Sequence, residues 1–184
     1  MTRRNRKAKP AARRGAASKA SEEFMARAYA MEIDAAERYG EFADQMEVHN
    51  NPEVATLFRQ LAEIEGRHAK QILEEMNWPQ MPPPVYALEW RTPEPPETAP
   101  VTELHYRMRP WHALALALRN EERAERFFVG VARSPKTPRE VRKLAAAMAE
   151  EEREHMRLIR EWMARVPQPD PDWSRDPDPP ALAD

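Results

Sequence analysis

The sequence contains no cysteine, which excludes disulfide bonds, thiolate catalysis, zinc ribbons and rubredoxin-type iron centres. It also lacks any run of about 18 apolar residues, so no membrane-spanning helix is predicted. No apolar segment follows the basic N-terminus in the way that a secretory signal requires. We therefore expect a cytoplasmic protein with no membrane partner.

Glycine is scarce as well, because only 4 of the 184 residues are Gly, whereas 33% are charged and 41% are hydrophobic. This composition is typical of a soluble helical protein, and the 19 prolines must then lie outside the helix interiors. A chain of this length is sufficient for one ordinary domain with a hydrophobic core.

Acidic residues are absent from the first 20 positions. Residues 1–20 carry eight Lys or Arg, so the net charge of -2 for the whole chain leaves the remainder near -10. We predict that residues 1–20 form a disordered, solubilising basic arm. The alternative is that the arm binds nucleic acid or an acidic partner through non-specific charge attraction.

Apolar residues recur with a helical period in four segments. The segments are residues 21–47, 52–76, 110–133 and 138–166. Ser21 is predicted to cap the first helix, and Asn51 followed by Pro52 marks the start of the second. Thr137 with Glu140 has the pattern of a capping box at the start of the fourth. Short turns join the helices in pairs, so each pair should form an antiparallel hairpin.

Proline marks the segments between and after the hairpins. Residues 77–109 contain eight prolines and are predicted to form a semi-extended crossover along the bundle. Residues 167–184 are rich in Pro and Asp and are predicted to form an irregular C-terminal tail. The predicted fold is therefore all-α, with one domain over residues 21–166 that is a four-helix bundle of two hairpins.

The two hairpins are related in sequence. Aligning Glu65 with Glu152 superimposes the second and fourth helical segments without a gap, and ten of the 24 pairs from Glu53/Glu140 to Met76/Met163 are identical. Aligning Glu32 with Glu121 relates the first and third segments more weakly. The chain is therefore one helical hairpin repeated, with the crossover between the copies.

The repeat contains a Glu-x-x-His motif on the apolar side of each second helix. Residues three apart on a helix share a face, so the Glu and His of each motif can reach the same central site. Each preceding helix adds one Glu on its apolar stripe. Distances from the hairpin turns place all four glutamates at one level of the bundle. The candidate metal ligands are Glu32, Glu65, His68, Glu121, Glu152 and His155.

Four carboxylates inside an apolar bundle are prohibitively costly unless their charge is neutralised. Two divalent cations balance four negative charges. One Glu from each of two helices, plus Glu-x-x-His from each of the other two, is the pattern of di-iron and di-manganese carboxylate bundles. Oxygen-rich ligation with imidazole suits Fe or Mn better than structural Zn.

A single Glu-x-x-His motif carries little information, because Glu-rich helices produce it by chance, and Glu151 and Glu154 are expected to form a solvated face. Two such motifs in aligned repeats, each with a partner Glu, favour a metal site. The remaining histidines, His49, His105 and His112, are predicted not to bind metal. Tyr39 lies two turns after Glu32 on the same face. It is either a residue close to the metals or a core tyrosine with a satisfied hydroxyl.

These residues resemble the rubrerythrin branch of the ferritin-like superfamily over about residues 21–166, apart from the crossover. The resemblance implies a ferritin-like four-helix bundle with a non-haem di-iron centre that reacts with peroxide or dioxygen. It further implies that Glu65 and Glu152 bridge the irons, with the other four candidates as terminal ligands. The segments that carry it are Glu32 with Tyr39, Phe58 to His68, Glu121, and Ala149 to His155.

The sequence departs from this family in two ways. Rubrerythrins proper carry a rubredoxin domain that supplies electrons, and a chain without cysteine cannot build one. They also place a further carboxylate three residues after the third-helix Glu, where this chain has Ala124. An alternative register that uses Glu122 with Glu125 would restore that spacing. We prefer Glu121, because it lies on the apolar stripe of its helix.

The first functional hypothesis is a di-iron oxidoreductase that reduces hydrogen peroxide or dioxygen with electrons from an external donor protein. Its cofactor would be two Fe ions per bundle, with Mn as the other candidate, and Tyr39 would be its catalytic residue. The alternative is a ferritin-like protein that oxidises Fe(II) and stores or transfers it. We also expect a homo-oligomer, namely a dimer. A third hypothesis is a nucleic-acid-associated protein that binds through residues 1–20.

Overall fold

The computed structural model describes residues 18–79 and 104–175, and its described part contains four α-helices and no strand. The helices are α1 (Lys19–Val48), α2 (Pro52–Met76), α3 (Pro110–Arg133) and α4 (Arg139–Met163). Of the predicted basic arm, only residues 18–20 are among the described residues. Most of the predicted crossover also lies outside them. None of the described helices is long and apolar enough to cross a membrane.

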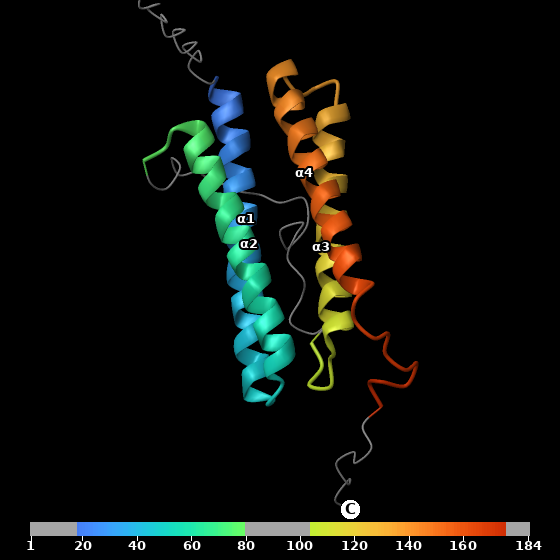
Figure 1. Ribbon diagram of the computed structural model, residues 1–184. Coiled ribbons are helices and arrows are strands. Elements are labelled where there is room, and N and C mark those ends of the chain that lie inside the picture. Colours follow the sequence, from blue (N-terminus) through green and yellow to red (C-terminus); the bar gives the residue numbers. More distant parts are fainter. Residues whose placement is uncertain (1–17, 80–103, 176–184) are drawn as a thin grey trace, which may run out of the picture.

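The helices form two antiparallel hairpins, α1 with α2 and α3 with α4, which lie side by side with nearly parallel long axes (Figure 1). Within each hairpin the helices pack along their length, and α1 contacts α4 while α2 contacts α3 between the hairpins. The result is the four-helix bundle of two repeated hairpins that the sequence predicts.

Helix α1 begins earlier than predicted. Its N-cap is Ser18, whose hydroxyl oxygen accepts a hydrogen bond from the Ser21 backbone N–H at 3.3 Å. The assignment of Ser21 as the cap is therefore wrong, and Ser21 is instead buried in the first turn. Both serines have the chemistry of a cap, so the sequence pattern did not distinguish them.

The start of α2 agrees with the prediction, because Asn51 accepts from the Val54 backbone N–H at 3.4 Å and Pro52 occupies the first helical position. At the start of α4 the predicted capping box is wrong. Pro138 is the N-cap residue and makes no side-chain cap, while the Glu140 carboxylate accepts from the Ser18 hydroxyl. The Glu140 side chain thus joins the N-terminus of α4 to that of α1.

The buried apolar side chains form two clusters, one toward each end of the bundle. Tyr39, Phe42 and Phe58 belong to the first cluster, and Phe24, Met31 and Phe128 to the second. Four buried glutamates belong to neither cluster. They are Glu32, Glu65, Glu121 and Glu152. Because each glutamate lies between a residue of one cluster and a residue of the other along its helix, the glutamates form a polar layer at mid-height between two hydrophobic ends.

The C-terminal segment packs onto the start of α3. The Trp173 ring lies over the His112 ring with centroids 3.7 Å apart, and it meets the His105 ring edge-on at 5.2 Å. The Arg107 guanidinium donates to the Arg175 carbonyl, which fixes the segment a second time. The described part of the predicted irregular tail is thus non-helical after α4 and in contact with the bundle.

Replacement of His112 by glutamine is expected to change how stability depends on pH. Burial lowers the pKa of His112, and the positive charges of Arg109 and His105 lower it further, against the opposing effect of its hydrogen bond with the Arg109 backbone. The unfolded chain therefore takes up this proton at a higher pH than the folded chain does. The stability that wild type owes to neutral His112 is present above about pH 6.5 and declines as the pH falls below that value.

The measurement is urea unfolding of wild type and His112→Gln between pH 5.5 and 7.5. The stability advantage of wild type should shrink as the pH falls, because glutamine does not titrate. An advantage that is constant over this range would contradict the expectation.

Candidate metal centre

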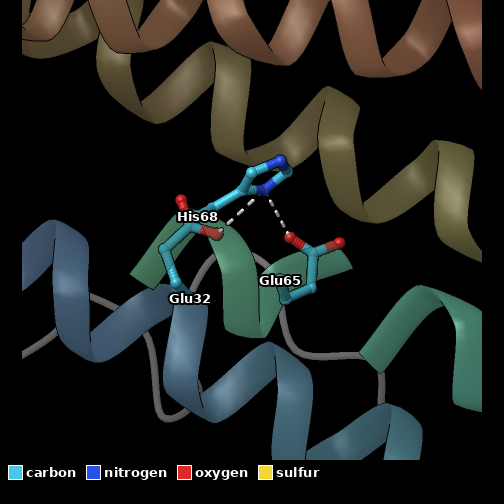
Figure 2. Close-up of side chains that lie close together, drawn as sticks. All are labelled: Glu32, Glu65 and His68. Carbon is cyan, nitrogen blue, oxygen red and sulfur yellow. Dashed lines mark hydrogen bonds and ion pairs between the residues drawn. The ribbon is translucent and has the colours of Figure 1, made fainter. Parts of the chain in front are cut away.

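The first hairpin brings together Glu32 of α1 with Glu65 and His68 of α2 (Figure 2). His68 Nδ1 lies 3.2 Å from a Glu65 carboxylate oxygen and 3.6 Å from a Glu32 carboxylate oxygen. Both carboxylates are almost completely buried, whereas the His68 side chain is partly exposed. The figure shows both carboxylates directed toward the same ring nitrogen. We call this cluster the first trio.

The second hairpin repeats the arrangement with Glu121 of α3 and with Glu152 and His155 of α4. His155 Nδ1 lies 3.1 Å from a Glu152 oxygen and 3.2 Å from a Glu121 oxygen. Both carboxylates are again buried. This second trio matches the first, residue for residue, as the internal repeat predicts.

The two trios meet through their imidazoles. The rings of His68 and His155 are stacked, with centroids 4.2 Å apart and planes inclined by 4°. The carboxylate of Glu65 is also close enough to the second trio for its protonation to respond to Glu121 and His155. The six side chains therefore form one continuous centre contributed by all four helices.

The donor set fits two divalent cations. Each trio offers two carboxylates and one imidazole, which balance the charge of one such ion. Neighbouring ligands on one ion, each at about 2.1 Å from it, are separated by about 3 Å. The nitrogen–oxygen distances of 3.1 to 3.6 Å within the trios are close to that separation. The arrangement could hold two metal ions without large movement of the side chains.

In the absence of metal, the pKa values of two side chains of the centre are raised, and a bound cation would instead favour the deprotonated forms of these groups. Burial raises the pKa of Glu65, and the negative charge of Glu121 raises it further, although His68 and His155 act against this. Burial alone would lower the pKa of His155, but the hydrogen bond and charge of Glu121 outweigh it and raise the pKa. Without metal, the centre therefore favours retention of protons.

The structure distinguishes the two registers considered for α3. The Glu121 side chain is 6% exposed and faces His155. The Glu122 side chain is 45% exposed and pairs with Arg160, and Glu125 pairs with Arg153 at 2.9 Å. The position three residues after Glu121 is Ala124, which is buried among apolar side chains. Glu122 and Glu125 therefore lie outside the cluster.

Tyr39 is completely buried next to the polar layer. Its ring stacks on Phe58 with centroids 6.0 Å apart, and its hydroxyl oxygen accepts a hydrogen bond from Asn120 Nδ2 at 3.0 Å. Asn120 is itself 2% exposed and directly precedes Glu121. Asn120 was missed in the sequence, although an asparagine on the apolar stripe beside a candidate ligand is a usable signal.

A small cavity of about 10 Å³ lies beside the first trio, with room for about one water molecule. Glu32 and His68 form part of its wall, and the remaining wall residues come from α2 and α4. These are Gln71, Ile72, Glu75, Met148 and Glu151. The centre is therefore close to a small opening on the first-hairpin side.

The other three histidines lie at the end of the bundle where α3 begins. The His49 ring lies 6.2 Å from Tyr106, and the Tyr106 ring stacks on His105. His112 joins this region through Trp173. Among the described residues, none of the three belongs to a cluster that could hold a metal ion.

The architecture and the donor set together define a class, namely helical bundles with a carboxylate–histidine centre for two metals. The sequence model of the rubrerythrin family matches residues 23–103 and 112–175. The chain belongs to the rubrerythrin family.

A solved relative is an uncharacterised conserved protein from Magnetospirillum magnetotacticum MS-1. It is 37% identical, and the alignment covers 84% of this chain and 99% of that one, with a TM-score of 0.57. Comparison with curated proteins found no match.

Proposed function

We propose that the protein is a non-haem di-iron oxidoreductase that reduces hydrogen peroxide or dioxygen with electrons from an external donor protein. The observation that carries the proposal is the pair of matched Glu/Glu/His trios joined by stacked imidazoles. Carboxylate oxygen with imidazole nitrogen suits iron or manganese. Family membership favours iron, and it favours peroxide or dioxygen as the substrate.

In this proposal Glu65 and Glu152 would hold both ions, and Glu32, His68, Glu121 and His155 would each hold one of them. The bridging role of Glu65 is supported by its electrostatic contact with Glu121 and His155 of the other trio. When bound, an iron pair would supply two electrons and polarise both oxygens of the substrate. The protein provides the buried layer that fixes these groups and excludes bulk water.

The donor of electrons is proposed to be a separate protein, because this sequence contains no cysteine with which to build a rubredoxin-type iron centre. The same observation favours the second candidate, a ferritin-like protein that oxidises Fe(II) and stores or transfers iron. The dimeric state and cytoplasmic location expected from the sequence belong to the proposal as predictions.

Anaerobic protein loaded with two Fe(II) should be oxidised within seconds when it is mixed with hydrogen peroxide, as followed by stopped-flow absorbance. A control with His155→Ala should hold less iron and react more slowly. Iron that stays Fe(II) for minutes in the wild-type protein would sink the oxidoreductase proposal. Uptake of iron far beyond two ions per chain into a large hollow assembly would favour the storage function instead.

A further inference from the structure

The described core contains one hydrogen-bonded chain that runs from the helix surface toward the metal centre. Asn120 Nδ2 contacts the Tyr39 hydroxyl at 3.0 Å, and the Arg123 guanidinium donates to Asn120 Oδ1. Tyr39 belongs to the first hairpin, whereas Asn120 and Arg123 belong to the second. Because buried amides are costly in an apolar core, this arrangement requires an explanation.

Arg123 fixes the orientation of the Asn120 amide. A guanidinium has only donors, so the amide group that faces it must be the carbonyl oxygen Oδ1. The amide NH₂ must then face Tyr39 and donate to the phenolic oxygen. In the flipped orientation, the amide NH₂ would face the N–H donors of Arg123. The orientation of the amide therefore follows from the hydrogen-bond network.

The position of the Tyr39 hydroxyl follows from the direction of helical side chains. Tyr39 lies seven residues after Glu32, about 10 Å along α1, and its ring extends back toward the N-terminus of that helix. The hydroxyl meets Asn120, which lies one residue before Glu121 on α3. The phenol therefore extends from its stacking contact with Phe58 to the residue that directly precedes Glu121.

We propose that Asn120 is a positioning residue that directs the Tyr39 O–H proton away from itself and toward the metal centre, where Tyr39 acts as a proton donor. This inference rests on the proposed function. Reduction of hydrogen peroxide consumes two electrons and two protons, breaks the O–O bond and gives two water molecules. The electrons would come from a bound pair of Fe(II) ions, each of which would become Fe(III). Tyr39 supplies one proton and is afterwards reprotonated from solvent, and water supplies the second proton.

Asn120→Asp tests the proposal with almost no change in shape. A carboxylate accepts from both neighbours, so the Tyr39 O–H would turn toward position 120 while Arg123 keeps its partner. In the metal-free protein, the infrared C–O stretching band of Tyr39 should then shift toward that of a phenol that only donates. Subtracting the spectrum of Tyr39→Phe isolates this band from the other three tyrosines.

The kinetic readout is the rate of peroxide-dependent Fe(II) oxidation at equal iron content. Asn120→Asp should reduce this rate about tenfold or more, as expected when a general acid is misdirected. Arg123→Gln, which lets the amide flip, should shift part of the infrared band and reduce the rate partially, whereas Arg123→Lys should restore both. Arg126→Gln is the matched control, because Arg126 is exposed and, among the residues that the structure describes, donates to the Glu122 carbonyl of its own helix.

An infrared band of Tyr39 that is unchanged in both Asn120→Asp and Arg123→Gln would overturn the proposal. So would an unchanged oxidation rate in Asn120→Asp when Tyr39→Phe is slow. The infrared test needs no metal and no turnover, so its result stands even if the wild-type protein fails to react with peroxide. That failure would refute only the proposed function.

Discussion

Glu65→Gln is expected to stabilise the metal-free protein at neutral pH while it weakens metal binding. The raised pKa of Glu65 means that the folded metal-free protein holds this proton more tightly than the unfolded chain does. Stability from Glu65 is therefore present at low pH and is lost as the pH rises above about 4.5, through the folded-state value. Each unit of upward shift corresponds to about 1.4 kcal/mol.

Glutamine has the same shape as glutamate but carries no charge to bury, so this loss disappears in the variant. The bound metal should fall below two ions per chain, because an amide is a weaker ligand than a carboxylate. Urea unfolding of metal-free protein between pH 5 and 8, together with metal analysis, measures both effects. Glu63→Gln is the matched control, since Glu63 is exposed on the same helix. A metal-free Glu65→Gln protein that is less stable than wild type at pH 7 would contradict the expectation.

Removal of metal is expected to lower the melting temperature strongly. A ligand that binds only the folded state at a concentration 100 times its dissociation constant stabilises that state by about 2.7 kcal/mol per site. For a chain of this size each kcal/mol corresponds to about 2–4 °C, so two sites imply a difference of roughly 10–20 °C. The cost of the buried acidic layer in the absence of cations has the same sign.

Calorimetry of protein dialysed against chelator, with and without added Mn(II), measures this difference without redox chemistry. Glu152→Ala should lose most of the metal-dependent rise, whereas Glu154→Gln should keep it, because Glu154 is exposed and pairs with Arg157. Equal melting temperatures with and without Mn(II) would show that the buried acids do not form a cation site.

The bundle and the inward direction of the candidate ligands were predictable, because both depend on periodic patterns. The apolar stripe of the third helical segment contains Glu121 and not Glu122, and the structure places Glu121 inside and Glu122 half-exposed against Arg160. The internal repeat then predicts two equivalent clusters from one argument. Such patterns are local to a helix, so the sequence contains them directly.

Features that depend on contacts between distant segments were not predictable in the same way. Ser18 and Ser21 are chemically equivalent as caps, and the choice between them accompanies the hydrogen bond from Ser18 to Glu140 of the other hairpin. Trp173 lies in a segment with no helical period and finds its place only against His112. The contact between Asn120 and Tyr39 likewise joins residues 81 positions apart.

The departure from rubrerythrins at Ala124 has a structural counterpart. Ala124 is completely buried in the second apolar cluster, so a carboxylate there would enter a hydrophobic environment. The neighbouring carboxylate of Glu125 is held at the surface by Arg153. The described part of this chain therefore provides two carboxylates and one imidazole for each candidate metal position, without a further acid from α3.

The stacked imidazoles of His68 and His155 lie where equivalent positions of the two hairpins contact each other. Each hairpin presents one Glu/Glu/His trio, and the two trios face each other as identical surfaces do in a twofold dimer. One hairpin paired with a copy of itself would possess every side chain that the centre requires. The chain is in this sense a dimer of hairpins fused into a single polypeptide, and its ancestry is consistent with duplication of a two-helix unit.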